Sequence, residues 1–272
     1  MKVHHLNCST LCPPLGLHLI NSAGTLVCHC LVVETEDGLV LVDTGLGVRD
    51  MALPGRLGAQ FGLLVRPKND PAESALIQLR RLGFKASDVR HIVATHLDLD
   101  HCGALPDFPD AKVHVYEPEF RAAMRPETRV EKLRYKAVQW AHHPRWERYP
   151  VAGETWFGFE AVRGLAGLPE DILLVPLVGH TRGHAGVAVK NARGWLLHAG
   201  DAYFHEDELD LARERGPRVL EMFQASEQHD GAARVKNRRR LRELKRDHGA
   251  EVTIFCAHDP AEFARAAGAA RT

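Results

Sequence analysis

Four potential metal ligands crowd into the short stretch at residues 95–101 (THLDLDH), which follows an apolar run. Side chains alternate along an extended chain, so His96 and Asp98 leave it on the same side and can converge on one ion. Asp100 and His101 follow, where the chain must turn. Imidazole and carboxylate groups at this density suit one or two borderline divalent cations better than a folded core. The alternative is a polar loop with chance histidines, because the chain contains 17 of them.

The same pattern, a polar ligand directly after an apolar strand-like run, returns three times later in the chain. The run 172–178 leads to GHTRGH, the run 195–199 leads to GD, and the run 252–257 leads to HD. In α/β proteins, strand ends on one side of a sheet are where sites gather. We therefore expect the first cluster to meet further polar side chains from these three places, namely His180, His184, Asp201 and His258.

The runs that position these side chains predict the strands of an α/β protein. Apolar or β-branched runs typical of strands lie at 25–35, 39–42, 92–94, 112–116, 155–162, 172–177, 186–189, 195–198 and 252–256. Helix-prone segments alternate with them at 71–82, 117–143, 230–248 and 260–270. This alternation predicts a layered α/β fold.

Asp43 is a further candidate, because it stands at the end of the strand-like run 39–42. Glycines at 45 and 47 follow it and allow a sharp turn. A carboxylate in this position can cap a helix or can support a metal-bound histidine from behind. The sequence leaves both interpretations open.

Two segments are predicted to cover the site. Residues 49–71 are rich in glycine and proline but also carry scattered large apolar side chains, which is typical of an irregular lid rather than a free linker. Residues 117–148 form a helical insertion between the first ligand stretch and the later ones. Selectivity for a substrate would lie in these two segments.

The composition limits the classes of partner. The 272 residues can bury a sizeable core, in one large domain or two small ones. Lysine plus arginine number 35, as do aspartate plus glutamate, so the basic footprint of a general nucleic-acid binder is missing and a small-molecule substrate is expected. No apolar run approaches the length of a membrane span or of a secretion signal, which predicts a cytoplasmic protein without membrane contact. The oligomeric state is left open.

The six cysteines show no compact disulfide framework, so reduced thiols are expected. Cys28 and Cys30 flank His29 in a predicted strand, where alternation places both thiols on one face. We interpret them as core residues rather than as metal ligands, because buried cysteine is ordinary.

The order THxxxDH, GHTxGH, GD after a strand and a late histidine, preceded by LVDTG, resembles the metallo-β-lactamase fold superfamily of metal-dependent hydrolases, and most of all its lactonase-like branch. The resemblance covers nearly the whole chain. It implies a single domain over residues 1–272 with a four-layer αββα sandwich and a binuclear metal site, zinc by resemblance. It also implies one metal held by His96, Asp98 and His184, a second held by Asp100, His101 and His258, Asp201 bridging both, Asp43 supporting a ligand histidine, and His180 in a structural or supporting role.

Asp98 departs from the family pattern, which has histidine at this position. Asp98, Asp100, Asp201 and a bridging hydroxide would sum to four negative charges, which offset two divalent cations completely. The metals would then be weaker Lewis acids, and manganese or iron would be favoured over zinc. The alternative is that a single metal binds.

The resemblance implies attack of a metal-bound hydroxide on an ester, lactone or thioester, with Asp100 orienting the nucleophile and passing a proton to the leaving group. The lactonase-like branch often places a tyrosine where this chain has Phe204, and the chain has Tyr203 one position early. Tyr203 reaches the site only if its loop bulges, and packing of its ring is the alternative. Glyoxalase-type thioester hydrolysis and flavodiiron redox chemistry stay open as other functions, although the first expects histidine at 98 and the second a glutamate there and a fused flavin domain.

Overall fold

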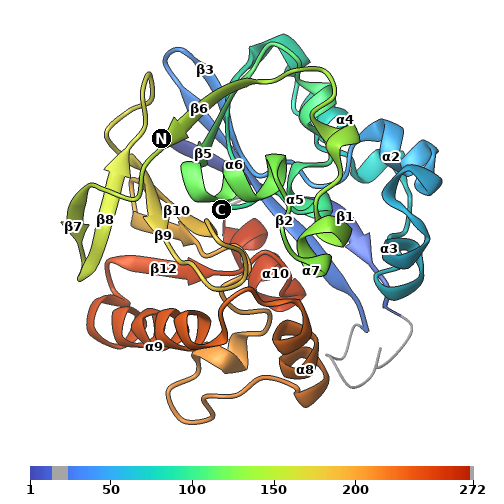
Figure 1. Cartoon of the computed structure of the whole chain (residues 1–272). Coiled ribbons are helices and arrows are strands. Elements are labelled where there is room, and N and C mark those ends of the chain that lie inside the picture. The colour runs from blue at the N-terminus through green and yellow to red at the C-terminus, as the bar shows by residue number, and fades with distance from the viewer. Residues whose placement is uncertain (14–23, 270–272) are drawn as a thin grey trace.

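The computed structural model describes residues 1–13 and 24–269, and its twelve named strands form two six-stranded sheets that face each other (Figure 1). The first sheet has the order β1-β2-β3-β4-β5-β6. Its strands β1 to β3 pair antiparallel and β3 to β6 pair parallel. The bounds are β1 Lys2–Leu11, β2 Leu26–Thr35, β3 Gly38–Val42, β4 Val89–Val93, β5 Lys112–Tyr116 and β6 Arg145–Tyr149.

The second sheet has the order β12-β11-β10-β9-β8-β7. Strands β11 and β12 are parallel, whereas the neighbouring pairs from β11 to β7 are antiparallel. The bounds are β7 Glu154–Trp156, β8 Phe159–Gly164, β9 Ile172–Pro176, β10 Ala185–Asn191, β11 Gly194–His198 and β12 Val252–Phe255.

Three apolar layers hold the sheets and helices together. The layer between the sheets contains Val33 and Val42 from the first sheet and Leu174 and Val187 from the second. Helices α4 (Ala75–Arg81) and α6 (Glu117–Met124) cover the outer face of the first sheet, and α9 (Gly231–His248) covers the outer face of the second. The predicted four-layer αββα sandwich is therefore confirmed.

Among the remaining helices, α10 (Pro260–Ala269) packs against β1 and β2. The predicted lid segment contains α2 (Val48–Ala52) and α3 (Ala59–Leu64). The other helices are α5 (Leu99–Cys102), α7 (Arg129–Arg134) and α8 (Arg218–Glu227). Short 3₁₀ turns lie at Pro54–Leu57, Pro71–Glu73, Ala86–Asp88, Leu105–Asp107, Ala137–Gln139 and Glu206–Leu209.

The single helix expected at 117–143 is wrong in detail, because the segment is broken into α6, α7 and a 3₁₀ turn. Pro126 follows the end of α6 at Met124 and cannot continue its hydrogen-bond ladder. Thr128 then starts α7 afresh, since its hydroxyl accepts from the backbone N–H of Glu131 while the Glu131 carboxylate accepts from the backbone N–H of Thr128. This break turns the end of α7 toward the ligand loops.

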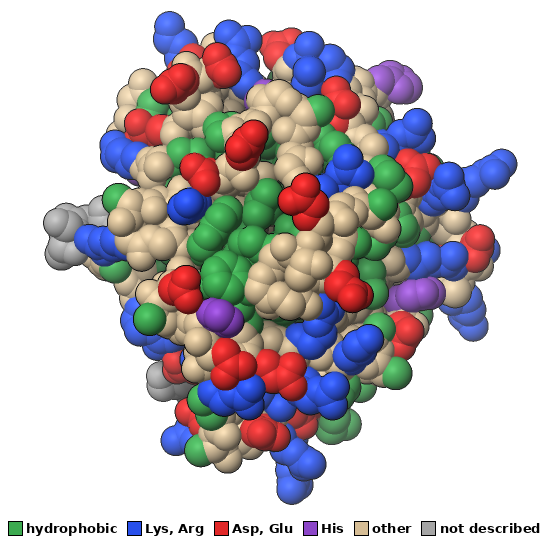
Figure 2. Space-filling view, turned by 90° about the vertical axis from the view of Figure 1, so that its left-hand side faces the viewer, with side chains coloured by type: hydrophobic (Ala, Val, Ile, Leu, Met, Phe, Trp, Pro, Cys, Tyr) green, Lys and Arg blue, Asp and Glu red, His purple; other side chains and the backbone are tan. Residues whose placement is uncertain are grey.

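Charged side chains of both signs are interspersed on the face shown in Figure 2, around a small apolar patch. No lysine- and arginine-rich field dominates this view, in agreement with the equal numbers of acidic and basic residues. Within residues 1–13 and 24–269, no helix combines the length and apolarity needed to cross a lipid bilayer.

Candidate metal centre

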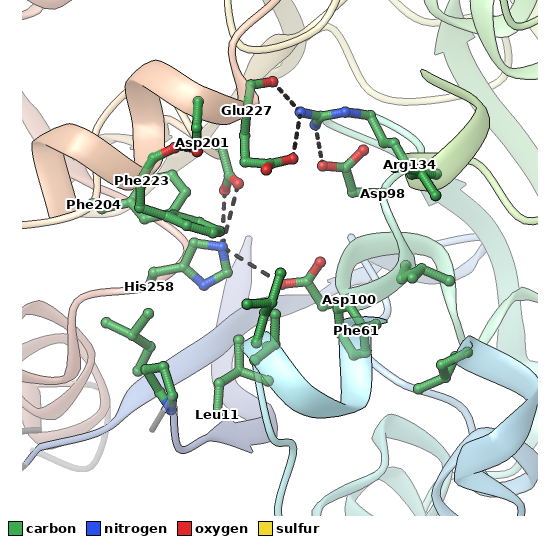
Figure 3. A pocket seen from close by; sticks show the side chains of 18 of the residues that line it. Leu11, Phe61, Asp98, Asp100, Arg134, Asp201, Phe204, Phe223, Glu227 and His258 are labelled. Atoms are coloured by element: carbon green, nitrogen blue, oxygen red, sulfur yellow. Dashed lines mark hydrogen bonds and ion pairs between the residues drawn. The ribbon is translucent and has the colours of Figure 1, made fainter. Parts of the chain in front are cut away.

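The candidate ligands meet at one end of the sandwich because each follows a strand that ends there. The chain leaves β4 through residues 94–98 and enters α5, while the loops after β9, β11 and β12 approach from the second sheet. Figure 3 shows Asp98 and Asp100 on one side of the resulting hollow, and Asp201 and His258 on the other. The structure thus brings together side chains that are far apart in the sequence.

One group of possible ligands consists of His96, Asp98, His180 and Asp201, whose ligand atoms lie within 4.8 Å of one another. The Nε2 atom of His96 is 3.3 Å from Asp98 Oδ2 and 3.8 Å from Asp201 Oδ2. The Nε2 atom of His180 is 3.1 Å and 3.4 Å from the same two oxygens. Two imidazoles and two carboxylates thus face one small volume, as a divalent cation requires.

A second group consists of His101, Asp201 and His258. The Oδ1 atom of Asp201 is 3.3 Å from His101 Nε2 and 3.2 Å from His258 Nε2. Asp100 joins from α5, with Oδ2 at 3.6 Å from His258 Nε2. Because Asp201 belongs to both groups, its carboxylate lies where a bridge between two ions would be needed.

Cys28 lies beside the second group of ligands, although the sequence favoured a core residue over a metal ligand at this position. Its thiol groups with Asp100 and His258, within the same 4.8 Å limit. It is also packed against Phe204 and Leu220 in an apolar cluster, which agrees with the predicted core role. The thiol therefore borders the second group from the apolar side.

These donors fit divalent metal ions, because several of their atoms are buried without a hydrogen-bond partner among the described residues. A buried polar atom left unpaired is costly. Three such atoms face the two groups, His96 Nε2, His101 Nε2 and Asp201 Oδ1, and a fourth, Asp98 Oδ1, belongs to a candidate ligand. Metal ions bound there would supply the missing partners.

The carboxylates and imidazoles of the cluster stabilise each other's charged forms. Burial alone would raise the pKa of Asp201, but the positive charges that His258 and His101 can carry outweigh it and hold that pKa well below its ordinary value. Burial would lower the pKa of His101, but Asp201, Asp100 and Asp43 raise it well above its usual value. The cluster is therefore strongly attractive to cations.

Asp43 supports His101 from behind, which is one of the two roles its sequence position left open. Its Oδ2 accepts from His101 Nδ1 at 2.8 Å and from the Thr95 hydroxyl at 2.8 Å, while Oδ1 accepts from the Thr95 backbone N–H. Asp43 has a φ of 54°, a left-handed conformation that aspartate tolerates better than most residues. The bond to Nδ1 leaves His101 Nε2 free to face the second group.

The positions of His180 and His184 are the reverse of those expected from the sequence. His184 donates from Nδ1 to the carbonyl of Leu177 at 2.8 Å, and its Nε2 accepts from the backbone N–H of Asp201 at 2.8 Å. Both ring nitrogens are therefore engaged by backbone groups, and His184 is wrong as a ligand in this geometry. His180 instead turns Nε2 toward Asp98 and Asp201, and burial together with the nearby Arg134 cation lowers its pKa to about 4.

Tyr203 does not reach the candidate centre, so the structure contradicts the catalytic role considered for it. Its side chain is fully buried, and its hydroxyl donates to the Glu262 carboxylate at 3.0 Å. Burial raises the pKa of Glu262 to about 7, so this carboxyl is partly protonated near neutral pH. Phe204 takes the wall of the site instead, with its ring centroid 4.7 Å from that of His258.

Arg134 is the main site residue that the sequence did not single out. Its guanidinium lies at the end of α7, and Nη1 donates to Asp98 Oδ2. The same Nη1 atom is 2.8 Å from His180 Nε2. Its Nη2 donates to the backbone carbonyl of Glu227. Burial opposes the charge of Asp98, but Arg134 and His96 hold its pKa well below the ordinary value. The charge balance estimated from the sequence, with four negative charges against two divalent cations, did not include this buried guanidinium.

Glu119 on α6 holds both ligand loops in place, and no pattern in the sequence singled it out. Its Oε1 accepts from the backbone N–H of Leu97 at 3.0 Å and from the Tyr135 hydroxyl at 3.0 Å, and its Oε2 accepts from the backbone N–H of Gly183 at 3.1 Å. Gly183 packs so closely that a Cβ there would collide with the Glu119 backbone. One carboxylate thus fixes the loop that carries His96 relative to the loop that carries His180.

We expect Glu119→Ala to lower the free energy of unfolding by about 3 kcal/mol, because it leaves two buried N–H groups and one hydroxyl without an acceptor. Urea unfolding followed by circular dichroism measures this. Glu117→Ala on the same helix is the control, since Glu117 pairs with Arg121 at the surface and should cost no more than about 1 kcal/mol. Equal losses for the two variants would contradict the role given to Glu119.

A cavity of about 540 Å³ opens directly onto the candidate ligands. Asp98, Asp100, Asp201 and His258 stand at its floor. The walls are mainly apolar and come from α3, α7, α8 and the end of β1 (Figure 3). They include Leu11, Leu26, Leu57, Phe61, Leu64, Leu133, Phe204, Leu220 and Phe223.

Comparison with known proteins agrees with this geometry. A family model described as the metallo-beta-lactamase superfamily matches residues 23–258. Probable metallo-hydrolases of Mycobacterium tuberculosis and Mycobacterium bovis are each 44% identical to this chain over 96% of its length and 81% of theirs. An N-acyl homoserine lactonase of Bacillus thuringiensis is 27% identical over 67% of this chain and 68% of its own.

Among solved structures, an N-acyl homoserine lactone hydrolase with bound N-hexanoyl-L-homoserine has a TM-score of 0.70 at 20% identity, covering 97% of this chain and 95% of that one. At this identity the likeness shows the fold alone. The family model, however, spans most of the chain and includes every candidate ligand. The chain therefore belongs to the metallo-beta-lactamase superfamily, among its metal-dependent hydrolases.

Proposed function

We propose that the protein hydrolyses a small ester or lactone whose non-reacting part is largely apolar. The observation that carries this proposal is the direct contact between the apolar cavity and the cluster of imidazoles and carboxylates. A substrate can place a carbonyl at the cluster only if the rest of it lies against the apolar walls. The lactonases among the relatives support the carbonyl class.

Two divalent metal ions, zinc by family resemblance, belong to this proposal. One would be held by His96, Asp98 and His180, the other by Asp100, His101 and His258, with Asp201 shared. When bound, such ions polarise a carbonyl and make water nucleophilic near neutral pH. Manganese or iron stays an alternative because of the oxygen ligand at 98, although Arg134 removes much of the charge argument for them.

The chain's own residues contribute orientation and proton handling. Asp43 fixes the ring of His101 through Nδ1. Asp100 stands at the cavity floor with 14% of its side chain exposed, so it can contact the substrate and pass a proton to the leaving oxygen. Phe204 and Phe223 wall the cavity and exclude water beside the reacting carbonyl.

A substrate panel tests the proposal. Protein loaded with zinc or manganese is offered lactones, aryl esters and thioesters, each with a short and a long alkyl chain. We expect lactones or esters to be turned over, with kcat/KM at least about tenfold higher for the long chain. Removal of metal by a chelator should abolish turnover, and returning the metal should restore it.

Matched variants relate the chain-length preference to the cavity. Phe61→Ala removes an aromatic side chain from the cavity wall. It should therefore reduce the ratio of kcat/KM between substrates with a long and with a short alkyl chain. Leu82→Ala alters an exposed side chain outside the cavity and should leave that ratio of kcat/KM unchanged. Turnover of thioesters alone would favour the glyoxalase-type alternative. Iron-dependent consumption of oxygen or nitric oxide without hydrolysis would favour the redox alternative.

A further inference from the structure

Asp98 stands where the family pattern has histidine, and its carboxylate is paired with Arg134, which lies 36 residues further along the chain. The Asp98 carboxylate is not a lone negative charge in the cluster. Its Oδ2 accepts from the Arg134 guanidinium and lies close to His96 and His180, whereas its Oδ1 is buried and has no partner among the described residues. One oxygen is therefore engaged by the cation and the other is available.

Arg134 is held in this position from its other side. Only 6% of its side chain is exposed, and its Nη2 donates to the backbone carbonyl of Glu227 at the end of α8, with the Glu227 carboxylate 3.8 Å away (Figure 3). The guanidinium of α7 is thus held between Asp98, just before α5, and the end of α8. A buried cation in such a place would be costly without the carboxylate that it faces.

We propose that Asp98 and Arg134 act as one unit that takes the place of a single neutral histidine. Asp98 provides an oxygen ligand, and Arg134 cancels the charge that this ligand would add. The net charge of the Asp98 carboxylate and the Arg134 guanidinium together is zero, as is the charge of a neutral imidazole. Arg134, whose Nη1 also lies 2.8 Å from His180 Nε2, is therefore a positioning residue that acts on the metal centre through Asp98 and His180. This inference rests on the metal centre of the proposed function.

A double-mutant cycle tests the pairing. Native protein, Asp98→His, Arg134→Met and the double variant are loaded with zinc, and metal affinity is measured by competition with a chromophoric chelator. Asp98→His alone strands the guanidinium beside the metals, so we expect affinity at the weaker position to fall about 10- to 100-fold. The double variant removes the stranded cation and supplies the imidazole, so affinity should return to within about threefold of native. Such recovery, together with no gain of affinity in Arg134→Met alone, shows that the two substitutions are coupled rather than additive.

The number of bound metals gives a readout that does not depend on activity. Native protein and Arg134→Met should both hold two ions by elemental analysis. A native protein that holds one ion, together with an Arg134→Met variant that gains a second, would overturn the proposal, because the guanidinium would then occupy a metal's place. Asp98→His binding both ions as tightly as native would overturn it as well.

Controls separate this pairing from folding and from the proposed function. Asp98→Asn keeps the shape of the side chain and should weaken metal binding like Asp98→His, with circular dichroism confirming the fold. Arg238→Met removes another buried arginine that pairs with a carboxylate, Glu208, and should leave metal affinity unchanged. If native protein bound no metal, the proposed function would fail together with the pairing. If native binds two metals and the cycle is additive, only the pairing fails.

Discussion

Replacement of Asp201 by asparagine is expected to abolish hydrolysis, with kcat/KM falling at least about 10³-fold. Asp201 lies at the centre of the cluster, because its two carboxylate oxygens come within 3.4 Å of His101, His180 and His258. An amide removes the negative charge and leaves only one oxygen to face both groups. Bound metal, measured by elemental analysis, should fall below two ions per chain.

The backbone at Asp201 should survive the substitution, which makes the result interpretable. The N–H of Asp201 donates to His184 Nε2, a bond that the side-chain change does not touch. Asp259→Asn is the matched control, because Asp259 is also a buried aspartate after a strand, but its carboxylate accepts from the backbone N–H groups of Glu206, Ala261 and Glu262. This control should keep kcat/KM within a few-fold of native. Equal losses in the two variants would argue against a central role for Asp201.

Substitutions at His180 and His184 should have opposite kinds of effect. His180→Ala removes an imidazole whose Nε2 faces two carboxylates, so we expect metal affinity at one position to fall at least about 100-fold while the fold persists. His184→Ala instead leaves the carbonyl of Leu177 and the N–H of Asp201 without partners. It should lower the free energy of unfolding by about 2 to 3 kcal/mol and retain two bound metals below its unfolding temperature.

Chelator competition and urea unfolding on the same two proteins separate these outcomes. Loss of a metal ion in His184→Ala with full retention in His180→Ala would restore the assignment made from the sequence. Loss in both variants would mean that the orientation of Asp201 through His184 matters as much as ligation itself. The pair of variants thus compares a histidine that faces the cluster with one that faces the backbone.

The overall architecture was predictable because it depends on patterns that are local in the sequence. Each ligand loop follows an apolar run, and strand β5 at Lys112–Tyr116 was predicted at its observed bounds. Strands β1 and β6 were missed for a physical reason: β1 carries histidines and polar residues, and β6 carries arginine and glutamate among its five residues. Both are edge strands of the first sheet, where the apolar signal is weakest.

The errors within the site concern the direction of side chains rather than their location. His180 and His184 were both placed near the cluster, but which ring faces it depends on the carbonyl of Leu177 and on the N–H of Asp201. These partners lie outside the GHTRGH segment. Arg134 was missed because the insertion contains several arginines, and only the break between α6 and α7 decides which of them points toward Asp98.

The short helix α7 serves two purposes at once, and this limits how the protein can diversify. Leu133 in the last turn of α7 and Lys136 just beyond the helix contribute to the cavity wall, while Arg134 between them pairs with Asp98. In a modular design, a new substrate range would come from exchanging the insertion while the reactive centre stayed constant. Here an exchanged insertion without an equivalent arginine would disturb the centre too, so changes in selectivity and changes at position 98 have to be inherited together.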